Sequence, residues 1–160
     1  LRDITEKHGC KYSAAAVGEV NVVTKMKEVG AVIGGEGNGG VIYPELHYGR
    51  DALVGAALFL SLLAKSGKKV SELKKQYPQY VITKDKIQLT PEMDIDAILA
   101  RVKEKFAGEK VTDIDGVKID FPDGWVHLRR SNTEPIIRIY SEAQSAERAN
   151  ELAANVKNQL

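Results

Sequence analysis

Residues 111–140 read VTDIDGVKIDFPDGWVHLRRSNTEPIIRIY, and this stretch decides the fold of the second half of the chain. Residues 111–121 predict a β-hairpin around Asp115-Gly116, a dipeptide that favours tight turns between paired strands. Residues 125–128 and 136–140 are short, largely apolar runs that predict two further strands with a polar loop between them. Strands that follow one another in this way predict an antiparallel sheet.

Elements on both sides of this stretch complete one domain. Residues 80–89 are rich in β-branched residues and predict another strand. Asp94 precedes a stretch with helical periodicity, as an N-cap does, and a second helix is expected from Ser145 to the end of the sequence. The apolar positions are Ile95, Ile98, Leu99, Val102 and Phe106 in the first helix, and Ala149, Leu152, Ala153, Val156 and Leu160 in the second. The order β-α-β-β-β-β-α predicts an α+β domain, an antiparallel sheet with two helices on one face.

The first half of the chain alternates helix and strand signals, which predicts an α/β layer structure. The expected helices are residues 1–8, 19–29 and 52–64, the last capped by Asp51 and followed by Gly67. The expected strands are residues 11–16, 31–33 and 41–43. The apolar run 52–64 is shorter than the roughly 20 residues that a bilayer requires. It therefore predicts a buried helix and no membrane span.

Polar, lysine-rich residues 66–78 mark a change of composition between the two halves. We interpret these lysines as a solvated linker and helix face, and we place the domain boundary near Tyr77. The predicted domains are therefore residues 1–76 and 77–160.

Composition limits the possible functions. The chain has 160 residues, 43% of them hydrophobic, and a net charge of +1. Such a balanced charge gives no field to attract a nucleic acid, so we expect no DNA or RNA partner. Cys10 is the single cysteine, and no signal peptide is visible, so we expect a cytoplasmic protein. Because Leu1 is not an initiator Met and residues 1–7 read as the inside of a helix, we expect a fragment of a longer protein.

The glycine-rich loop Gly34 to Gly40 is the first candidate site. Gly35, Gly37 and Gly40 satisfy G-x-G-x-x-G, but a strand follows where a dinucleotide fingerprint needs a helix. Glu36 and Asn38 are the polar side chains of the loop. A carboxylate accepts two hydrogen bonds from neighbouring hydroxyls and an amide both donates and accepts, which suits a sugar ring. The alternative is a plain glycine turn with solvated side chains.

The loop Arg129-Arg130-Ser131-Asn132-Thr133-Glu134-Pro135 is the second candidate site. Arginine forks, hydroxyls and exposed turn N–H groups are the parts of a phosphate-binding nest. The loop lacks the G-K-[ST] sequence and the following helix of a P-loop, so it does not indicate nucleotide hydrolysis. The alternative is an Asx or ST turn with surface arginines.

The two loops together resemble those of the α-D-phosphohexomutase superfamily, which comprises phosphoglucomutase, phosphomannomutase and phosphoglucosamine mutase. Residues 35–40, GEGNGG, resemble its sugar-binding loop, and residues 129–138, RRSNTEPIIR, resemble its C-terminal phosphate-binding loop. Residues 49–52 and 78–81 are also typical of it. The resemblance implies an α/β fragment, the later part of the third of four domains, followed by the whole fourth domain.

The resemblance also implies an activity and site residues. A phosphoserine in the first domain would exchange its phosphate with a hexose phosphate, through a hexose bisphosphate, to interconvert hexose 1-phosphate and hexose 6-phosphate. Mg²⁺ would be bound by an Asp-rich loop of the second domain, and neither motif is in this sequence. The partners would be the hexose phosphate and the missing N-terminal domains. Glu36 and Asn38 would bind sugar hydroxyls; the phosphate ligands would be Arg129, Ser131, Asn132 and Thr133, with Arg130 and Arg138 as helpers.

Several points stay open on this sequence. Arg138 has an alternative role as a surface partner of Glu134 or Glu142. Ala16 stands where many relatives carry Lys, and Asn38 and Gly40 stand where many carry Ser and His, so the preferred hexose (glucosamine, glucose or mannose) is undetermined. The oligomeric state is also undetermined. A different class of function, a non-catalytic sugar-phosphate-binding or interaction module, is the alternative to an enzyme part.

Overall fold

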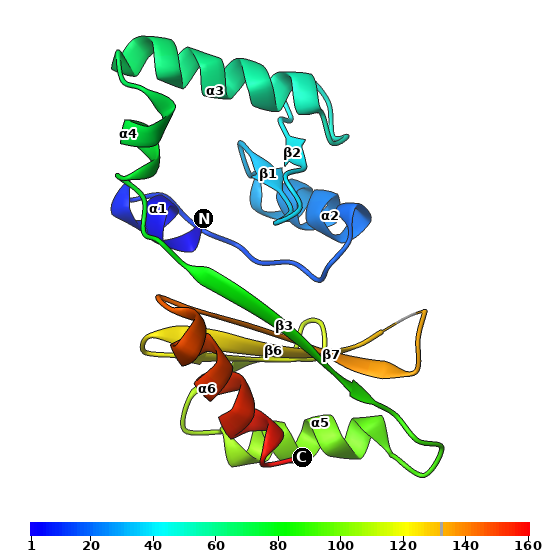
Figure 1. Ribbon diagram of the computed structural model, residues 1–160. Coiled ribbons are helices and arrows are strands. Elements are labelled where there is room, and N and C mark those ends of the chain that lie inside the picture. Colours follow the sequence, from blue (N-terminus) through cyan, green and yellow to red (C-terminus); the bar gives the residue numbers. More distant parts are fainter. Residues whose placement is uncertain (132) are drawn as a thin grey trace. The chain divides into compact units, whose positions relative to one another are not determined.

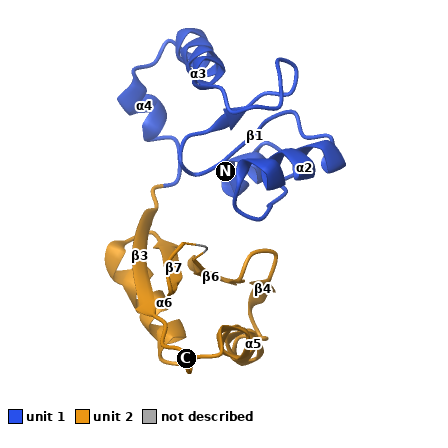
Figure 2. Cartoon of the chain, turned by 90° about the vertical axis from the view of Figure 1, so that its right-hand side faces the viewer, with its two compact units in different colours: residues 1–78 blue, residues 79–160 orange. Residues whose placement is uncertain are grey.

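The computed structural model describes residues 1–131 and 133–160. The chain divides into two units, residues 1–78 and 79–160 (Figure 2). The composition change at residues 66–78 predicts this division after residue 76. Each unit carries one of the two candidate loops.

The first unit combines four helices with a two-stranded sheet (Figure 1). Its helices are α1 (Arg2–Lys7), α2 (Glu19–Val29), α3 (Ala52–Ser66) and α4 (Val70–Lys74), and its strands are β1 (Gly34–Gly35) and β2 (Val41–Ile42). The strands are antiparallel, with Gly34 opposite Ile42 and Gly35 opposite Val41. The glycine loop therefore connects two strands, as its sequence predicts.

Glycine is required in β1 because both of its residues lie against other atoms. A Cβ on Gly34 would lie 2.2 Å from the sulfur of Met26 in α2, and a Cβ on Gly35 would lie 2.2 Å from the carbonyl oxygen of Gly40. Met26 is buried, so this close approach fixes α2 against the sheet. The start of the candidate loop is thus held by packing.

Three predictions for the first unit are wrong. Residues 11–16 form no strand, and strand pairing begins at Gly34 instead of residues 31–33. Pairing begins at Gly34 and Gly35 because only residues without a Cβ can approach their neighbours this closely. Val32, which precedes them, is 78% exposed. Helix α3 contains no buried residue, and Leu53 on it is 82% exposed, because the small sheet supports only the flank where Gly55 meets Val41.

The second unit is a five-stranded antiparallel sheet with two helices on one face. The sheet order is β3-β7-β6-β5-β4. The elements are β3 (Val81–Gln88), α5 (Ile95–Lys105), β4 (Lys110–Thr112), β5 (Val117–Phe121), β6 (Gly124–Arg130), β7 (Ile136–Ala143) and α6 (Ala146–Lys157). In Figure 1 both helices lie on the same side of the sheet. The predicted fold class is confirmed.

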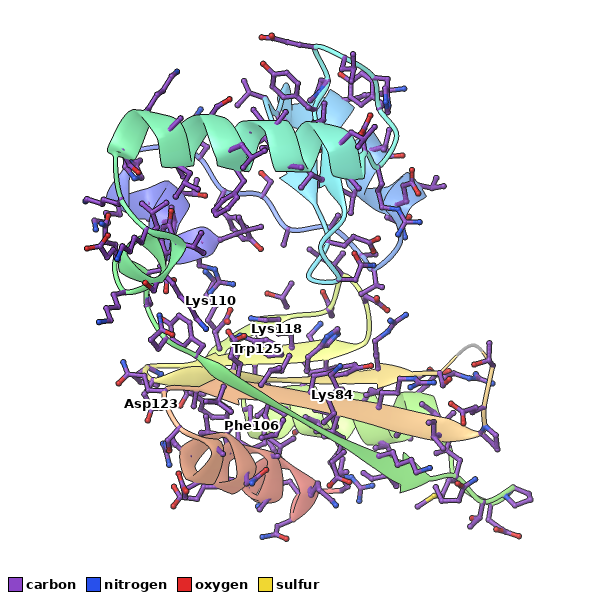
Figure 3. All side chains as sticks on the ribbon, turned by 45° about the horizontal axis from the view of Figure 1, so that its top comes forward. Lys84, Phe106, Lys110, Lys118, Asp123 and Trp125 are labelled. Carbon is purple, nitrogen blue, oxygen red and sulfur yellow. The ribbon has the colours of Figure 1, made fainter. Side chains whose placement is uncertain are left out.

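The core of the second unit lies between the sheet and these helices. Ile119, Leu128 and Ile139 of the sheet and Val102 and Val156 of the helices are at most 1% exposed and belong to one cluster. Burying each such side chain contributes roughly 1.5–3 kcal/mol. Because side chains alternate along a strand, the residues between these core positions lie on the face without helices, as Lys118 and Trp125 do in Figure 3.

Among the described residues, no helix has both the length and the apolar character needed to cross a membrane.

Candidate functional site

The loop between β1 and β2 is closed by its own backbone. The Glu36 N–H donates to the Gly40 carbonyl at 3.1 Å, and the Gly39 N–H donates to the Glu36 carbonyl at 3.1 Å. Gly39 has φ +92°, a conformation that side chains disfavour. The loop therefore presents Glu36 and Asn38 on a short, internally bonded turn.

The Glu36 carboxylate is held by two groups that lie far from it in the sequence. Its Oε1 accepts the backbone N–H of Gly18, the N-cap of α2, at 3.1 Å. Its Oε2 lies 3.7 Å from Nη1 of Arg50, and the side chain is 15% exposed. A helix N-terminus and a guanidinium both stabilise a carboxylate. Each oxygen has a second lone pair, so the group can still accept hydroxyl donors.

Asn38 is exposed and completes this cluster. Its Nδ2 lies 3.5 Å from Glu36 Oε2, and its Oδ1 accepts the N–H of Gly40 at 3.1 Å. The structure thus brings together the two residues that the sequence predicts to bind sugar hydroxyls. Their role in binding stays a prediction.

Arg50 and Glu19 are residues of this cluster that sequence reasoning missed. Arg50 Nε donates to Glu19 Oε2 at 2.8 Å, and the Arg50 backbone N–H donates to Glu19 Oε1 at 3.3 Å. Arg50 therefore bridges the first turn of α2 and the Glu36 carboxylate. The two residues are 31 positions apart, so no local pattern reveals the contact.

His47 belongs to the structure of the segment before α3. Its Nδ1 accepts the Gly49 N–H at 2.9 Å, so its Nε2 carries the proton and donates to Asp51 Oδ2 at 3.1 Å. The other Asp51 oxygen caps α3 by accepting the N–H groups of Leu53 and Val54. The bond from the Val54 N–H, followed by that from His47, lowers the pKa of Asp51 below its usual range. His47 therefore supports the helix cap.

In the second unit, Arg129 and Arg138 lie directly opposite each other in the β6–β7 ladder. Both are on the face without helices, since their neighbours Leu128 and Ile139 are in the core. Nε of Arg129 lies 3.4 Å from Oδ2 of Asp115. This nitrogen is buried, and it has no hydrogen-bond acceptor within the part of the chain that the structure describes.

Ser131 connects the loop to Arg138. It is 7% exposed, and its backbone N–H donates to the Ile136 carbonyl at 3.0 Å. Its Oγ accepts Nη2 of Arg138 at 3.3 Å and lies 3.4 Å from the N–H of Thr133. The Arg138 guanidinium also pairs with Glu134, one of the two partners considered for it from sequence. Arg129, Ser131, Thr133 and Arg138 therefore border one polar loop.

Arg130 and Asn132 are the two further phosphate ligands that the sequence predicts. Arg130 is exposed and follows Arg129 in the same strand, so it lies on the opposite face of the sheet. Its side chain lines a hollow together with Ser131 and Thr133 of the loop and with Met93 and Ile95. Asn132 lies outside the described residues.

Acidic residues do not converge on a metal site in this part of the molecule. Within residues 1–131 and 133–160, no group of three or more His, Cys, Asp or Glu side chains could hold a metal ion. Asp94 caps α5 by accepting the Ala97 N–H at 3.1 Å, and Asp113 pairs with Lys103. The resemblance implies an Mg²⁺ loop in another domain, outside this sequence, and that expectation stays a prediction.

Comparison with known proteins identifies the class to which these two units belong. Residues 1–80 match the family domain described as "Phosphoglucomutase/phosphomannomutase, alpha/beta/alpha domain III", and residues 81–159 match "Phosphoglucomutase/phosphomannomutase, C-terminal domain". The chain therefore belongs to the phosphoglucomutase/phosphomannomutase family and corresponds to its third and C-terminal domains.

Individual relatives agree with this assignment. A protein of Thermococcus kodakarensis named phosphoglucomutase/phosphomannomutase is 46% identical over 153 residues, which cover 94% of this chain and 33% of the relative. A phosphoglucosamine/phosphogalactosamine mutase of Sulfurisphaera tokodaii is 35% identical, with 98% and 35% covered. A phosphoglucomutase/phosphomannomutase family protein of Burkholderia thailandensis, solved by crystallography, superposes with a TM-score of 0.76 at 28% identity, with 97% and 33% covered.

The chain thus spans about a third of the length of these relatives.

Proposed function

We propose that this chain supplies the sugar-hydroxyl and phosphate contacts of a phosphohexomutase, which interconverts hexose 1-phosphate and hexose 6-phosphate. The single observation that carries the proposal is the opposition of Arg129 and Arg138 beside the Ser131 hydroxyl. Two like charges directly opposite each other on a sheet destabilise it. A bound phosphate dianion would offset that repulsion and accept charge-assisted hydrogen bonds from the guanidinium groups.

The phosphate ligands in this proposal are Arg129, Ser131, Thr133 and Arg138, and Asn132 joins them through the family resemblance alone. Arg130 stays a proposed helper, because it follows Arg129 on the other face of the strand but lines one hollow with Ser131 and Thr133. For Arg138, binding a phosphate competes with the ion pair to Glu134. The loop would hold the phosphate that is not reacting.

Glu36 and Asn38 are the proposed sugar ligands. The Gly18 N–H and Arg50 hold the Glu36 carboxylate through contacts within the protein. A group fixed in this way loses little conformational freedom when it binds a hydroxyl. It can therefore accept hydroxyls of a sugar in either orientation.

The transfer itself needs parts of the protein that these residues do not provide. By family resemblance, a phosphoserine would donate and recover the phosphate through a hexose bisphosphate, and Mg²⁺ would be bound outside this chain. Residues 1–160 contribute positioning, which accounts for a large part of phosphoryl-transfer catalysis. The cytoplasm is the proposed location, and glucosamine, glucose or mannose phosphate is the proposed substrate.

Binding to the 160-residue chain tests the proposal. Hydrogen bonds to charged groups contribute about 1.5–3 kcal/mol, so Arg129→Ala should weaken binding of inorganic phosphate and of hexose 6-phosphates roughly 10- to 150-fold. Arg101→Ala, which removes an exposed arginine of α5, is the matched control and should leave binding unchanged. Calorimetry or NMR titration measures both. Equal affinities of the two variants would contradict the proposal.

An activity assay separates an enzyme part from a binding module. Residues 1–160 alone should not interconvert hexose 1- and 6-phosphates, because the sequence lacks the phosphoserine motif of the family. The whole protein should do so at rates of about 1–10³ s⁻¹, which are typical of enzymes. Turnover by the 160-residue chain would refute this division of labour, and an inactive whole protein that still binds hexose phosphate would favour the non-catalytic module.

A further inference from the structure

The turn between β4 and β5 lies directly against the end of β6. Gly116 has φ +70°, and a Cβ on it would lie 2.1 Å from the Leu128 carbonyl oxygen and 2.9 Å from the Arg129 Cα. Only glycine fits both this conformation and this separation. The turn is therefore packed onto the backbone of the residue that carries the proposed phosphate-binding guanidinium.

His127 fixes the same turn from the side. Its Nε2 bonds to the backbone carbonyl of Asp115, and since a carbonyl only accepts, the ring nitrogen is the donor. His127 lies between Lys118 of β5 and Tyr140 of β7 in the sheet register. The position of Asp115 is thus set by a glycine contact and by a side-chain hydrogen bond.

The Asp115 carboxylate engages one particular nitrogen of Arg129. Oδ2 of Asp115 lies 3.4 Å from the buried Nε, and the two side chains are 25% and 19% exposed. An arginine presents five N–H donors in a rigid fork. A carboxylate at Nε orients the guanidinium plane and leaves the terminal Nη groups for a ligand.

We propose that Asp115 is a positioning residue, which orients Arg129 for the phosphate and offsets its repulsion from Arg138. The inference rests on the proposed function, because it takes Arg129 as a phosphate ligand. Arg138 has its own carboxylate partner in Glu134, so each carboxylate offsets part of the repulsion, and a bound phosphate would offset the remainder. Asp115 stays on the turn and does not contact the phosphate.

The sign of one binding change separates positioning from simple electrostatics. Removing a negative charge near an anion site strengthens anion binding if only Coulomb forces act. Loss of orientation weakens it instead. We expect Asp115→Asn to weaken binding of inorganic phosphate to the 160-residue chain roughly 2- to 10-fold, less than the loss in Arg129→Ala, because the guanidinium stays and only its orientation is lost. Asn-Gly favours tight turns as Asp-Gly does, so the variant keeps the turn.

Asp113→Asn is the matched control, because it removes the same charge from the same connection. Asp113 pairs with Lys103 and its side chain is 60% exposed, so we expect phosphate affinity to be unchanged or slightly increased. A second measurement follows the Arg129 Nε–H resonance by ¹⁵N NMR in the unliganded protein. Its hydrogen exchange should be slow in the wild type and in Asp113→Asn, and faster in Asp115→Asn.

The outcomes are distinguishable. If Arg129→Ala weakens phosphate binding while Asp115→Asn leaves it unchanged or strengthens it, the positioning role is wrong and the proposed function stands. If Arg129→Ala leaves phosphate binding unchanged, the loop is no phosphate site and both proposals fail. Weaker binding in Asp115→Asn, together with faster Nε–H exchange, supports the positioning role.

Discussion

Replacement of Glu36 by Gln tests whether the loop geometry depends on a carboxylate. Oε1 of Glu36 accepts the Gly18 N–H at 3.1 Å, and Oε2 lies 3.7 Å from Arg50 Nη1 and 3.5 Å from Asn38 Nδ2. Glutamine has one acceptor oxygen and one NH₂ group. In either orientation of the amide, a donor faces a donor in a side chain that is 15% exposed.

An unsatisfied donor at such a position costs about 1–3 kcal/mol. Local opening of the loop should become easier by the same amount, so exchange of the Gly18 amide hydrogen should accelerate roughly 5- to 150-fold. Binding of hexose 6-phosphates should weaken, while binding of inorganic phosphate should not change. Amide exchange by NMR measures the first effect, and titration measures the second.

Glu28→Gln is the control for this substitution. Glu28 is in the same unit, its side chain is 62% exposed, and it pairs with Lys25 on the surface of α2. We expect neither Gly18 exchange nor ligand binding to respond to it. If Glu36→Gln left Gly18 exchange within the range of this control, the carboxylate would not hold the loop, and our account of the site would be refuted.

Three further predictions concern stability. Gly116→Ala should lower the free energy of unfolding of the second unit by more than about 2 kcal/mol in urea titrations, because the alanine would have a left-handed conformation and its Cβ would clash with the backbone. Gly108→Ala is the control and should not have this effect, because a Cβ on Gly108 meets open space. Burial lowers the pKa of His127, so the unfolded chain binds more protons below about pH 6.5 and stability should fall from pH 7.5 to 5.5. His127→Gln should remove the contribution of His127 to this pH dependence of stability. An unchanged pH dependence in the variant would contradict the prediction. Limited proteolysis should cut near Pro78 and leave residues 79–160 intact; survival of residues 1–78 instead would contradict this.

The fold of the second unit could be predicted from sequence because every local signal agrees there. Asp94 caps α5 as expected by accepting the Ala97 N–H, and Ser145, where the last helix is expected to begin, accepts the Arg148 N–H. The apolar positions of both helices enter one core with the inward residues of the strands. Caps, periodicity and turn residues are local properties, and in this unit the tertiary structure does not override them.

The first unit could be predicted less well because its strands carry little side-chain information. Strand β1 consists of two glycines, so the pairing depends on close backbone approach, which no hydrophobic pattern reports. The apolar run of α3 predicts burial, but burial also needs a facing surface, and the described sheet has only two short strands. Composition predicts the helix and does not predict its exposure.

The candidate site shows the same division between local and distant information. The residue types of both loops indicate their chemistry, and the sequence therefore identifies Glu36 and Arg129. Their partners come from elsewhere: Arg50 reaches Glu36 from the segment before α3, and Asp115 reaches Arg129 from the β4–β5 turn. Sheet register, which decides that Arg129 opposes Arg138, is visible only in the structure.

In both loops an ion pair orients the proposed ligand-binding side chain, and the charges of the two partners are exchanged between the loops. In the first unit a guanidinium, Arg50, fixes the carboxylate of Glu36, and in the second a carboxylate, Asp115, fixes the guanidinium of Arg129. A polar side chain left free would lose about 0.5–1.5 kcal/mol of conformational freedom on binding a ligand. A partner of opposite charge restricts the side chain before the ligand binds, so this loss of conformational freedom is smaller. The same partner also competes with the ligand for the charged group. The structure limits this competition, because Arg50 lies 3.7 Å from its carboxylate and Asp115 lies 3.4 Å from its guanidinium nitrogen. At these separations the ion pairs orient the groups and leave their remaining donors and acceptors for the sugar phosphate that we propose as the ligand.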